Sequence, residues 1–172
     1  MKKFKVIPIS LLLIGSLFNN HFLLAENRKA ASYKVMASEN GNLSINNVQK
    51  LLLEGDRFTK LGKFDKAKEY YDNGRNLAKQ LSGFYRDLNG AFRGLDARIP
   101  MEMDDKGRKS LSAWADANAR LAAFYKRKNQ PEVAVPLLVE IIKLMSPNST
   151  QGKAAFGELR ALGFIETNYQ GI

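Results

Sequence analysis

The sequence predicts an all-helical fold, and three features support this prediction. Beyond residue 44, apolar residues recur at spacings of three, four and seven, which is the rhythm of one face of an α-helix. Residues that start or stop helices, mainly serine, asparagine, glycine and proline, separate the apolar stretches. No stretch shows the strict alternation of apolar and polar residues that is typical of a half-buried strand.

The first helix is expected over residues 46–61. Either Ser44 or Asn46 can cap its start, because a short polar side chain accepts a hydrogen bond from an unpaired backbone N–H of the first turn. Gly62 is expected to end it in a left-handed conformation that its missing side chain permits. A short turn then leads into the next helix.

Two further helices are expected over residues 65–81 and 84–97, and the Ser82–Gly83 pair is expected to separate them. Two glycines inside the second of these helices each cost about 1 kcal/mol relative to alanine. Residues 98–107 contain a proline and several acidic residues, and they predict an irregular connection.

A long helix over residues 108–128 is expected to carry a clear apolar stripe that includes Trp114 and Leu121. Asn118 is the one polar residue that interrupts this stripe.

Two shorter helices are expected at the end of the chain. Asn129 and Glu132 form a capping pair for a helix that ends near residue 145. Pro136 lacks a backbone N–H, so it predicts either a late start or a kink in that helix. Asn148 or Ser149 is expected to cap the last helix, which reaches Leu162 and ends at Gly163.

Length and composition limit the function classes. The chain has 172 residues, of which 45% are hydrophobic and 26% charged, and these values fit one globular domain rather than a disordered chain. The absence of cysteine excludes disulfides, thiolate metal sites and a cysteine nucleophile. The single histidine, His21, lies in the expected targeting segment of residues 1–25, which argues against histidine catalysis.

Residues 1–25 have the pattern of a targeting segment, with three lysines followed by an uncharged apolar run. The run is shorter than the roughly 20 residues that span a membrane, which favours a cleaved signal peptide with Ala25 before the cut. Leu23 fits a cleavage site poorly, so an uncleaved N-terminal anchor is the alternative. In both cases the body is expected in the periplasm, the thylakoid lumen or at an extracytoplasmic membrane face.

Without its first 25 residues the chain loses three lysines and no acids, so its formal charge falls from +10 to +7. Export argues against nucleic acid as the partner of this basic body, and anionic lipid or an acidic protein surface fits better. Lysine-rich helices that merely solvate their outer faces are the simpler explanation of the charge. Residues 26–45 are polar and aperiodic, and they predict a flexible leader.

Two segments share a spacing of small and aromatic residues that resembles the tetratricopeptide repeat. The first comprises Gly55, Phe58, Gly62, Phe64, Ala67, Tyr71 and Gly74. The second comprises Ala122, Tyr125, Asn129, Pro131, Ala134, Leu138 and Ile141, of which Pro131 and Ile141 depart from the pattern. Asn129 can take the left-handed turn of Gly62, and the offset of 67 residues leaves room for one degenerate repeat between the two segments.

The resemblance implies antiparallel helical hairpins over residues 46–163, stacked as a short right-handed superhelix with a C-terminal capping helix, and a tail over residues 164–172. Small residues would let the helices approach and aromatic residues would fill the spaces between them. The implied packing residues are Gly55, Phe58, Gly62, Phe64, Ala67, Tyr71, Ala122, Tyr125, Ala134 and Leu138. An ordinary helical bundle is the alternative.

Members of this family bind peptides or helices in a groove lined by the first helix of each repeat. By position, the groove residues implied here are Gln49, Leu52, Asp56, Thr59, Lys60, Asp116, Ala119, Ala123, Lys126 and Arg127. Leu52 and Asp56 stand where the carboxylate-gripping members have lysine or asparagine, so that clamp is not expected. Lys60, Lys126 and Arg127 could receive an acidic segment of a partner, or could simply be solvated helix ends.

Catalytic readings have less support. Glu102, Asp104 and Asp105 form an acidic cluster that suggests a weak calcium or magnesium site or a hydrolase, but the spacing of a calcium loop does not follow. Trp114, Phe84, Tyr85 and Phe92 could stack on a ligand, although buried aromatic packing explains them as well. We therefore expect no catalytic residue, no metal and no cofactor.

Together these observations predict a non-enzymatic scaffold or adaptor that binds another protein outside the cytoplasm. Resemblance to small exported members of the family suggests assembly or stabilisation of a membrane-associated complex. The alternative is a peripheral protein that uses basic helix faces to bind anionic lipid.

Overall fold

The computed structural model describes residues 41–169, and the helices of this part are α2 to α6. Their bounds are Ile45–Lys60 for α2, Phe64–Ala91 for α3, Arg98–Arg127 for α4, Pro131–Met145 for α5 and Thr150–Ala161 for α6. Residues 41–169 contain no strand, so the predicted all-helical class is confirmed. The expected targeting segment and most of the expected leader lie outside the described residues.

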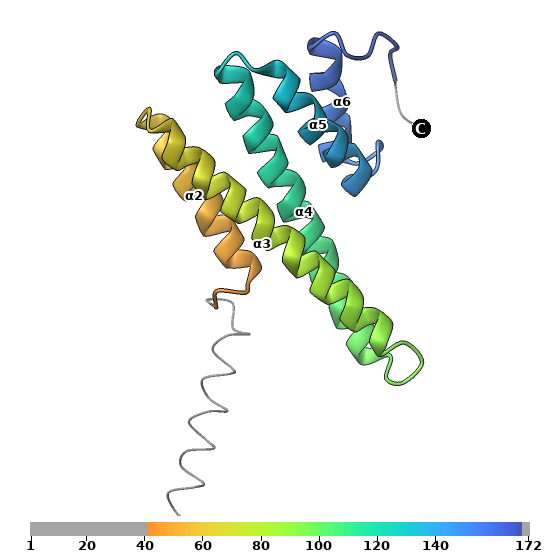
Figure 1. Cartoon of the computed structure of the whole chain (residues 1–172). Coiled ribbons are helices and arrows are strands. Elements are labelled where there is room, and N and C mark those ends of the chain that lie inside the picture. Colours follow the sequence, from red (N-terminus) through yellow and green to blue (C-terminus); the bar gives the residue numbers. More distant parts are fainter. Residues whose placement is uncertain (1–40, 170–172) are drawn as a thin grey trace, which may run out of the picture.

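Helices that follow one another along the chain pack against one another. α2 packs on α3, α3 on α4, α4 on α5 and α5 on α6, and α2 also contacts α4. Figure 1 shows α3 lying across α2 and α4, while α5 lies between α4 and α6. The chain therefore forms a row of antiparallel hairpins that is continued by a single last helix.

The core consists of two adjoining clusters. The first joins α2, α3 and α4 through residues such as Val48, Leu81 and Leu121, and the second joins α4, α5 and α6. Tyr125 and Leu137 are half-buried and pack against both clusters. The interior is thus continuous from α2 to α6.

Two predicted serine caps are confirmed. The Ser44 hydroxyl accepts a hydrogen bond from the backbone N–H of Asn47 at 3.1 Å at the start of α2. At the start of α6, the Ser149 hydroxyl accepts from the backbone N–H of Gly152 at 2.9 Å. Each cap satisfies a backbone donor that has no partner inside its helix.

The predicted left-handed turn residues also have positive φ angles. Gly62 has φ 68°, Asn129 has φ 57° and Gly163 has φ 72°, and each follows the end of a helix. The predicted capping pair of Asn129 and Glu132 is wrong, because the residue that precedes α5 is Gln130 and its side chain makes no capping hydrogen bond.

The predicted helix break at Ser82 and Gly83 is wrong, since α3 runs without interruption for 28 residues from Phe64 to Ala91. Leu81 is 2% exposed and packs in the first core cluster. Contacts of this kind with α4 outweigh the weak helix preference of a glycine, which costs only about 1 kcal/mol. The helix expected to reach residue 97 ends at Ala91 instead.

The irregular connection predicted over residues 98–107 is also wrong, because α4 begins at Arg98. Pro100 stands in the first turn of α4, where backbone N–H groups have no partner inside the helix and a proline costs little. Acidic residues in the next turns pair with basic residues four positions later, which favours a helix.

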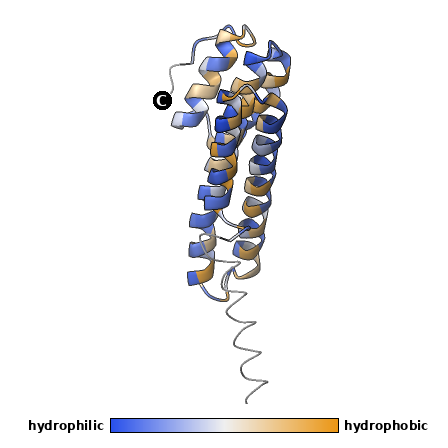
Figure 2. Ribbon diagram, turned by 90° about the vertical axis from the view of Figure 1, so that its left-hand side faces the viewer, coloured by the Kyte–Doolittle hydropathy of each residue, from blue (hydrophilic) through white to orange (hydrophobic). Residues whose placement is uncertain are grey.

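The expected degenerate repeat is therefore not a separate hairpin. Its residues form the outer halves of α3 and α4, which extend beyond α2 and end in a turn around Gly94 (Figure 1). Leu95 is 79% exposed and Met101 is 73% exposed at this tip. Figure 2 shows hydrophobic residues mixed with hydrophilic ones along both long helices.

α5 begins at Pro131 and runs through Pro136, so the expected late start is wrong. Its first residue is a proline, which suits the first helical position because its φ angle is already close to helical. Ala134, Leu138 and Ile141 face the second core cluster.

Small residues at the predicted packing positions allow close contact between helices. A Cβ atom built on Gly55 would lie 2.4 Å from the Tyr71 ring, so α2 and α3 need a glycine at this point. Ala67, Ala122 and Ala134 are buried as well. Of the other packing positions, Phe58, Tyr71 and Leu138 are buried, Tyr125 is half-buried, and Gly62 and Phe64 are exposed.

Candidate partner-binding face

The ten predicted groove residues lie on α2 and α4, and most of them line one of two separate hollows. The first hollow lies between α2 and α4 and has a volume of about 520 Å³. Gln49, Leu52 and Asp116 line it together with Lys106 and Lys109. Leu52 is 3% exposed and belongs to the core, so it contributes the floor of this hollow.

The second hollow lies between α4 and α6, with α5 at its base, and has a volume of about 240 Å³. Its walls consist largely of alanine side chains. The predicted groove residues Ala119, Ala123 and Lys126 contribute from α4, and Leu138 and Ile141 contribute from α5. We call this the alanine hollow.

Two polar links join α4 to α6 along the alanine hollow. The side-chain amide of Gln151 donates to the Asp116 carboxylate at 2.6 Å and to the backbone oxygen of Ser112 at 3.3 Å. The Lys126 ammonium forms an ion pair with Glu158. Lys126, Gln151 and Glu158 also line the hollow, which is therefore an apolar recess with polar groups on its walls.

Asp56 and Thr59 bind within the fold rather than facing outward. The Tyr71 hydroxyl donates to Asp56 at 2.7 Å and lies 3.1 Å from the Thr59 hydroxyl. Arg120 of α4 also binds Asp56, with its Nε 3.2 Å from the carboxylate. Burial, together with the hydrogen bond to Asp56, raises the pKa of Tyr71, so its hydroxyl remains a donor. These contacts fix α2 against α3 and α4.

Lys60 and Arg127 are the last residues of α2 and α4 and lie at the ends of the predicted groove. Both are exposed, and neither has an acidic partner within 4.0 Å among residues 41–169. Their position therefore differs from that of Lys126, which is paired beside the alanine hollow.

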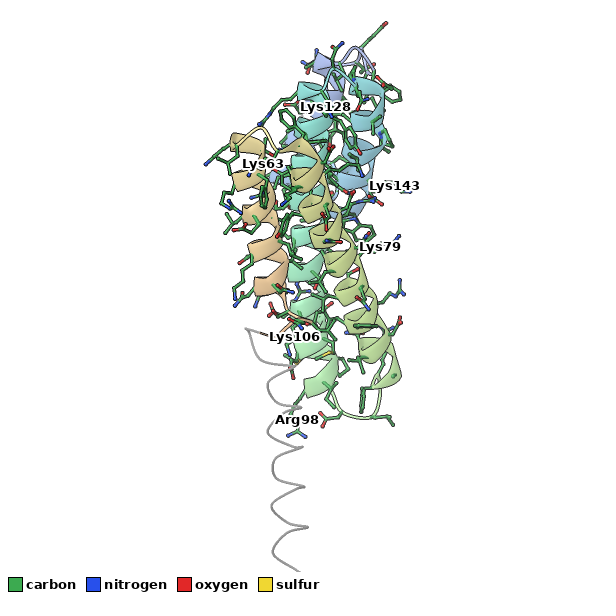
Figure 3. The ribbon with its side chains drawn as sticks, turned by 60° about the vertical axis from the view of Figure 1, so that its left-hand side comes forward. Lys63, Lys79, Arg98, Lys106, Lys128 and Lys143 are labelled. Atoms are coloured by element: carbon green, nitrogen blue, oxygen red, sulfur yellow. The ribbon has the colours of Figure 1, made fainter. Side chains whose placement is uncertain are left out.

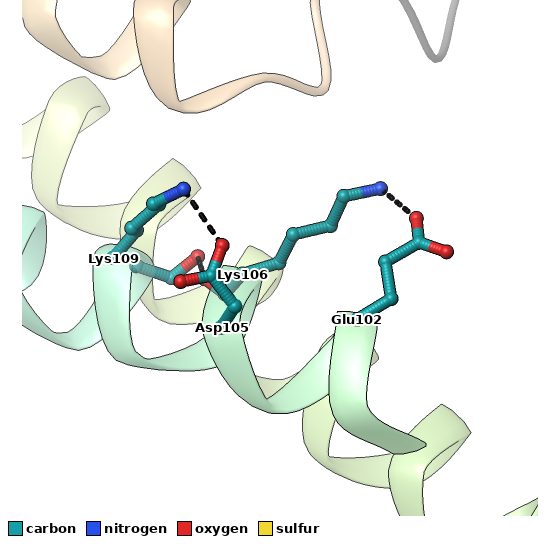
Figure 4. Close-up of polar contacts among 5 residues, drawn as sticks. Glu102, Asp105, Lys106 and Lys109 are labelled. Atoms are coloured by element: carbon teal, nitrogen blue, oxygen red, sulfur yellow. Dashed lines mark hydrogen bonds and ion pairs between the residues drawn. The ribbon is translucent and has the colours of Figure 1, made fainter. Parts of the chain in front are cut away.

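The acidic cluster lies on α4 rather than in a loop. Glu102 binds Lys106 at 2.5 Å and Asp105 binds Lys109 at 2.7 Å, as Figure 4 shows. Asp104 pairs in the same way with the residue four positions later, Arg108. The hydrogen bond from Lys109 lowers the pKa of Asp105. Each carboxylate thus has its own cation.

Within residues 41–169, no three histidine or acidic side chains are grouped so that they could hold one metal ion. Among the described residues 41–169, none of the helices α2 to α6 is both long enough and apolar enough to span a membrane.

The aromatic residues considered for ligand stacking do not share one environment. Phe84 is 45% exposed on α3, whereas Trp114 and Tyr85 line a hollow between the outer halves of α3 and α4. Phe92 is half-buried and follows the end of α3. The arrangement brings only Trp114 and Tyr85 together.

One polar network was not predicted from the sequence. Arg75 of α3 donates to the Asn118 side-chain oxygen at 2.6 Å and to the Glu140 carboxylate at 2.5 Å. Asn118 was noted as a polar interruption of an apolar stripe, and that was the only signal. Its partners lie 43 and 22 residues away in the chain.

Searches of protein-family models, curated proteins and solved structures found no significant match to this chain.

Proposed function

We propose that this chain is a non-enzymatic protein-binding scaffold, and that the face formed by α2, α4 and α6 holds a segment of another protein. The alanine hollow is the observation that carries the proposal. It is apolar, is open to the surface and has space for about one large side chain. A partner that inserts one apolar side chain there would bury it against Leu138 and Ile141.

The helix order supports a comparison with the tetratricopeptide repeat. In this comparison α2–α3 and α4–α5 are two repeats, and α6 is the solitary helix that caps the array. The first helices of such arrays line the concave side, where partners bind. Both hollows of the candidate face involve these helices, α2 with α4 and α4 with α6.

The polar links beside the alanine hollow suggest how a partner is positioned. Asp116 and Gln151 offer an exposed carboxylate and a half-buried amide, and Lys126 and Glu158 offer a pair of opposite charges. Such groups provide specificity around an apolar anchor. A partner segment with one apolar residue and nearby acidic residues would compete with Glu158 for Lys126.

The proposed location is outside the cytoplasm, where the chain would assist the assembly or stability of a membrane-associated complex. This part of the proposal rests on the targeting pattern of residues 1–25.

A photo-reactive amino acid placed at position 119 of the full chain tests the proposal. Ala119 is exposed and lines the alanine hollow, whereas the matched control, Ala91, is exposed at the far end of α3. In the native compartment we expect a discrete protein adduct from position 119 and none from position 91. Equal adducts from both positions, or none from position 119, contradict the proposal.

A charge exchange separates partner binding from internal pairing. Lys126→Glu removes the cation and also breaks its ion pair with Glu158. The double variant Lys126→Glu with Glu158→Lys restores the pair with the charges exchanged. If Lys126 acts by keeping α6 in place, the double variant recovers the adduct; if it binds an acidic partner directly, recovery is partial.

A further inference from the structure

Two turns meet at one end of the molecule. Lys128, directly after α4, has its Nζ atom 5.7 Å from the centre of the Phe64 ring at the start of α3. Lys128 also lines a shallow hollow with Gly62 and Lys63 of the turn between α2 and α3. Figure 3 shows Lys63 and Lys128 at this end, with Lys106 and Arg98 towards the opposite end. We call residues 60–66 and 127–132 the basic end.

The basic end carries cations that the fold does not neutralise. Ten cations of residues 41–169 have an acidic partner within 4.0 Å, and none of them is at the basic end. The cations of the basic end are Lys60, Lys63, Lys66, Arg127 and Lys128. Its carboxylates are Asp65 and Glu132, so positive charge exceeds negative charge by three.

Favourable interaction with the helix dipole explains the positions of some of these cations but not of all. Lys60 and Arg127 stand at helix C-termini, where the helix dipole favours positive charge. Lys63 and Lys66, in contrast, stand at the N-terminus of α3, where the dipole disfavours it. Their placement is therefore unfavourable with respect to the dipole of α3, although the Lys66 Nζ atom also lies 5.6 Å from the centre of the Phe58 ring.

Apolar side chains are exposed among these cations. Leu61 is 55% exposed at the end of α2, and Phe64 is 39% exposed at the start of α3. Gly62, with φ 68°, forms the turn between them. A lysine side chain has a long apolar stem that ends in a charged ammonium group. Lysines around an exposed leucine and phenylalanine therefore suit the surface of an anionic membrane, where charged headgroups lie above hydrocarbon chains.

We propose that the basic end binds the surface of a membrane that contains anionic lipid. Leu61 and Phe64 enter the interface between headgroups and acyl chains, and the surrounding lysines contact lipid phosphates. With few apolar residues and an excess of three charges, this binding is reversible and weakens as salt is added. The basic end lies at the C-terminal ends of α2 and α4, away from the hollow between these helices that Lys106 lines, and its Arg127 directly follows Lys126, which lines the alanine hollow.

A fluorescence experiment on the full chain tests this contact locally. Trp114 is the single tryptophan, and its indole N–H has no hydrogen-bond partner within the described structure, so Trp114→Phe removes the native signal without breaking such a bond. Leu61→Trp in this background then reports the environment of position 61. The probes are vesicles of phosphatidylcholine alone and vesicles with about one third phosphatidylglycerol.

With the anionic vesicles only, we expect the fluorescence emission of the tryptophan at position 61 to shift to shorter wavelength and to be quenched by brominated acyl chains. Both effects should disappear at high salt. In the same background, Lys63→Glu, Lys66→Glu and Lys128→Glu together should weaken the response at least about tenfold. The matched control reverses Lys50, Lys143 and Lys153, which are exposed and lack ion pairs within residues 41–169, and it should change the response less than about threefold.

Three results overturn the proposal. One is an unchanged emission spectrum of the tryptophan at position 61 in the presence of anionic vesicles. This is also the result expected if the chain attaches to vesicles through residues 1–25 alone. The second is an equal loss in the control variant, and the third is a response to soluble polyglutamate but not to vesicles, which assigns the basic end to an acidic protein. The crosslinking test at position 119 does not depend on any of these outcomes.

Discussion

The buried side chain of Asn118 donates a hydrogen bond to the Glu140 carboxylate at 2.8 Å, and the two residues share Arg75 as a donor. Asn118 is 0% exposed, although it lies in an otherwise apolar stripe of α4. The three side chains come from α3, α4 and α5, so this network ties the first hairpin to the second. Its removal should therefore affect the stacking of the hairpins.

Asn118→Ala should lower the free energy of unfolding by about 1–3 kcal/mol, because Arg75 and Glu140 each lose a hydrogen bond in a partly buried site. Urea unfolding followed by circular dichroism measures the change. Asn73→Ala on the exposed side of α3 is the control and should change stability by less than about 0.5 kcal/mol. Equal effects of the two changes would show that the network adds no stability.

Glu140 should make stability depend on pH. Burial acts to raise the pKa of Glu140, but the hydrogen bonds from Arg75 and Asn118 outweigh it and hold the pKa below its ordinary value of 4.5. Because the pKa is lower in the folded state, the stabilisation is complete above pH 4.5 and is lost as the pH falls through the folded-state pKa.

The stability difference between the wild type and Glu140→Gln should thus be largest near neutral pH and smaller in acid. Unfolding curves at several pH values measure it. In an Arg75→Met background the pH dependence of this difference should shrink, since the hydrogen bond from Arg75 is gone. A dependence that remains unchanged there would assign the effect to another group.

Two glycines in helices should respond to alanine in opposite directions. Gly55→Ala would place a Cβ 2.4 Å from the Tyr71 ring and should destabilise the fold by about 1–3 kcal/mol. Gly90→Ala would place a Cβ in open space within α3 and should stabilise the fold by about 0.4–1 kcal/mol. Thermal unfolding distinguishes the two, and a gain from Gly55→Ala would contradict the close approach of α2 and α3.

The outer halves of α3 and α4 should open more readily than the rest of the helices. Phe84, Leu88 and Met101 are exposed there, to 45%, 43% and 73%, whereas Ala78 and Leu121 are buried in the first core cluster. Amides of residues 84–91 and 98–107 should therefore exchange with deuterium at least about tenfold faster than amides around Ala78 and Leu121. Uniform exchange along both helices would instead indicate one cooperative unit.

Local sequence signals predicted the helix ends correctly where the chain itself supplies the partner. Ser44 and Ser149 bind backbone groups three residues away, and Gly62 and Asn129 adopt a left-handed conformation that few other residues tolerate. The Ser82–Gly83 break was wrong because packing of α3 on α4 outweighs a local preference of about 1 kcal/mol.

The candidate contact surfaces could be predicted only in part, because they depend on contacts between residues that are distant in the sequence. The spacing of residues 119, 123 and 126 placed them on one face of α4, but the hollow they line requires α6. The basic end requires Lys128 to lie next to Phe64, which is 64 positions earlier in the sequence. No local pattern indicates that approach.

The unequal lengths of the helices offer a practical use. At 1.5 Å per residue, the 28 residues of α3 span about 42 Å and the 16 residues of α2 about 24 Å, so the paired long helices outreach their neighbour. The turn at their tip is not part of either core cluster, and it is not part of the alanine hollow or the basic end. A fluorescent protein or an epitope tag inserted after Gly94 would thus make the molecule visible in its own compartment while leaving both candidate contact surfaces unobstructed.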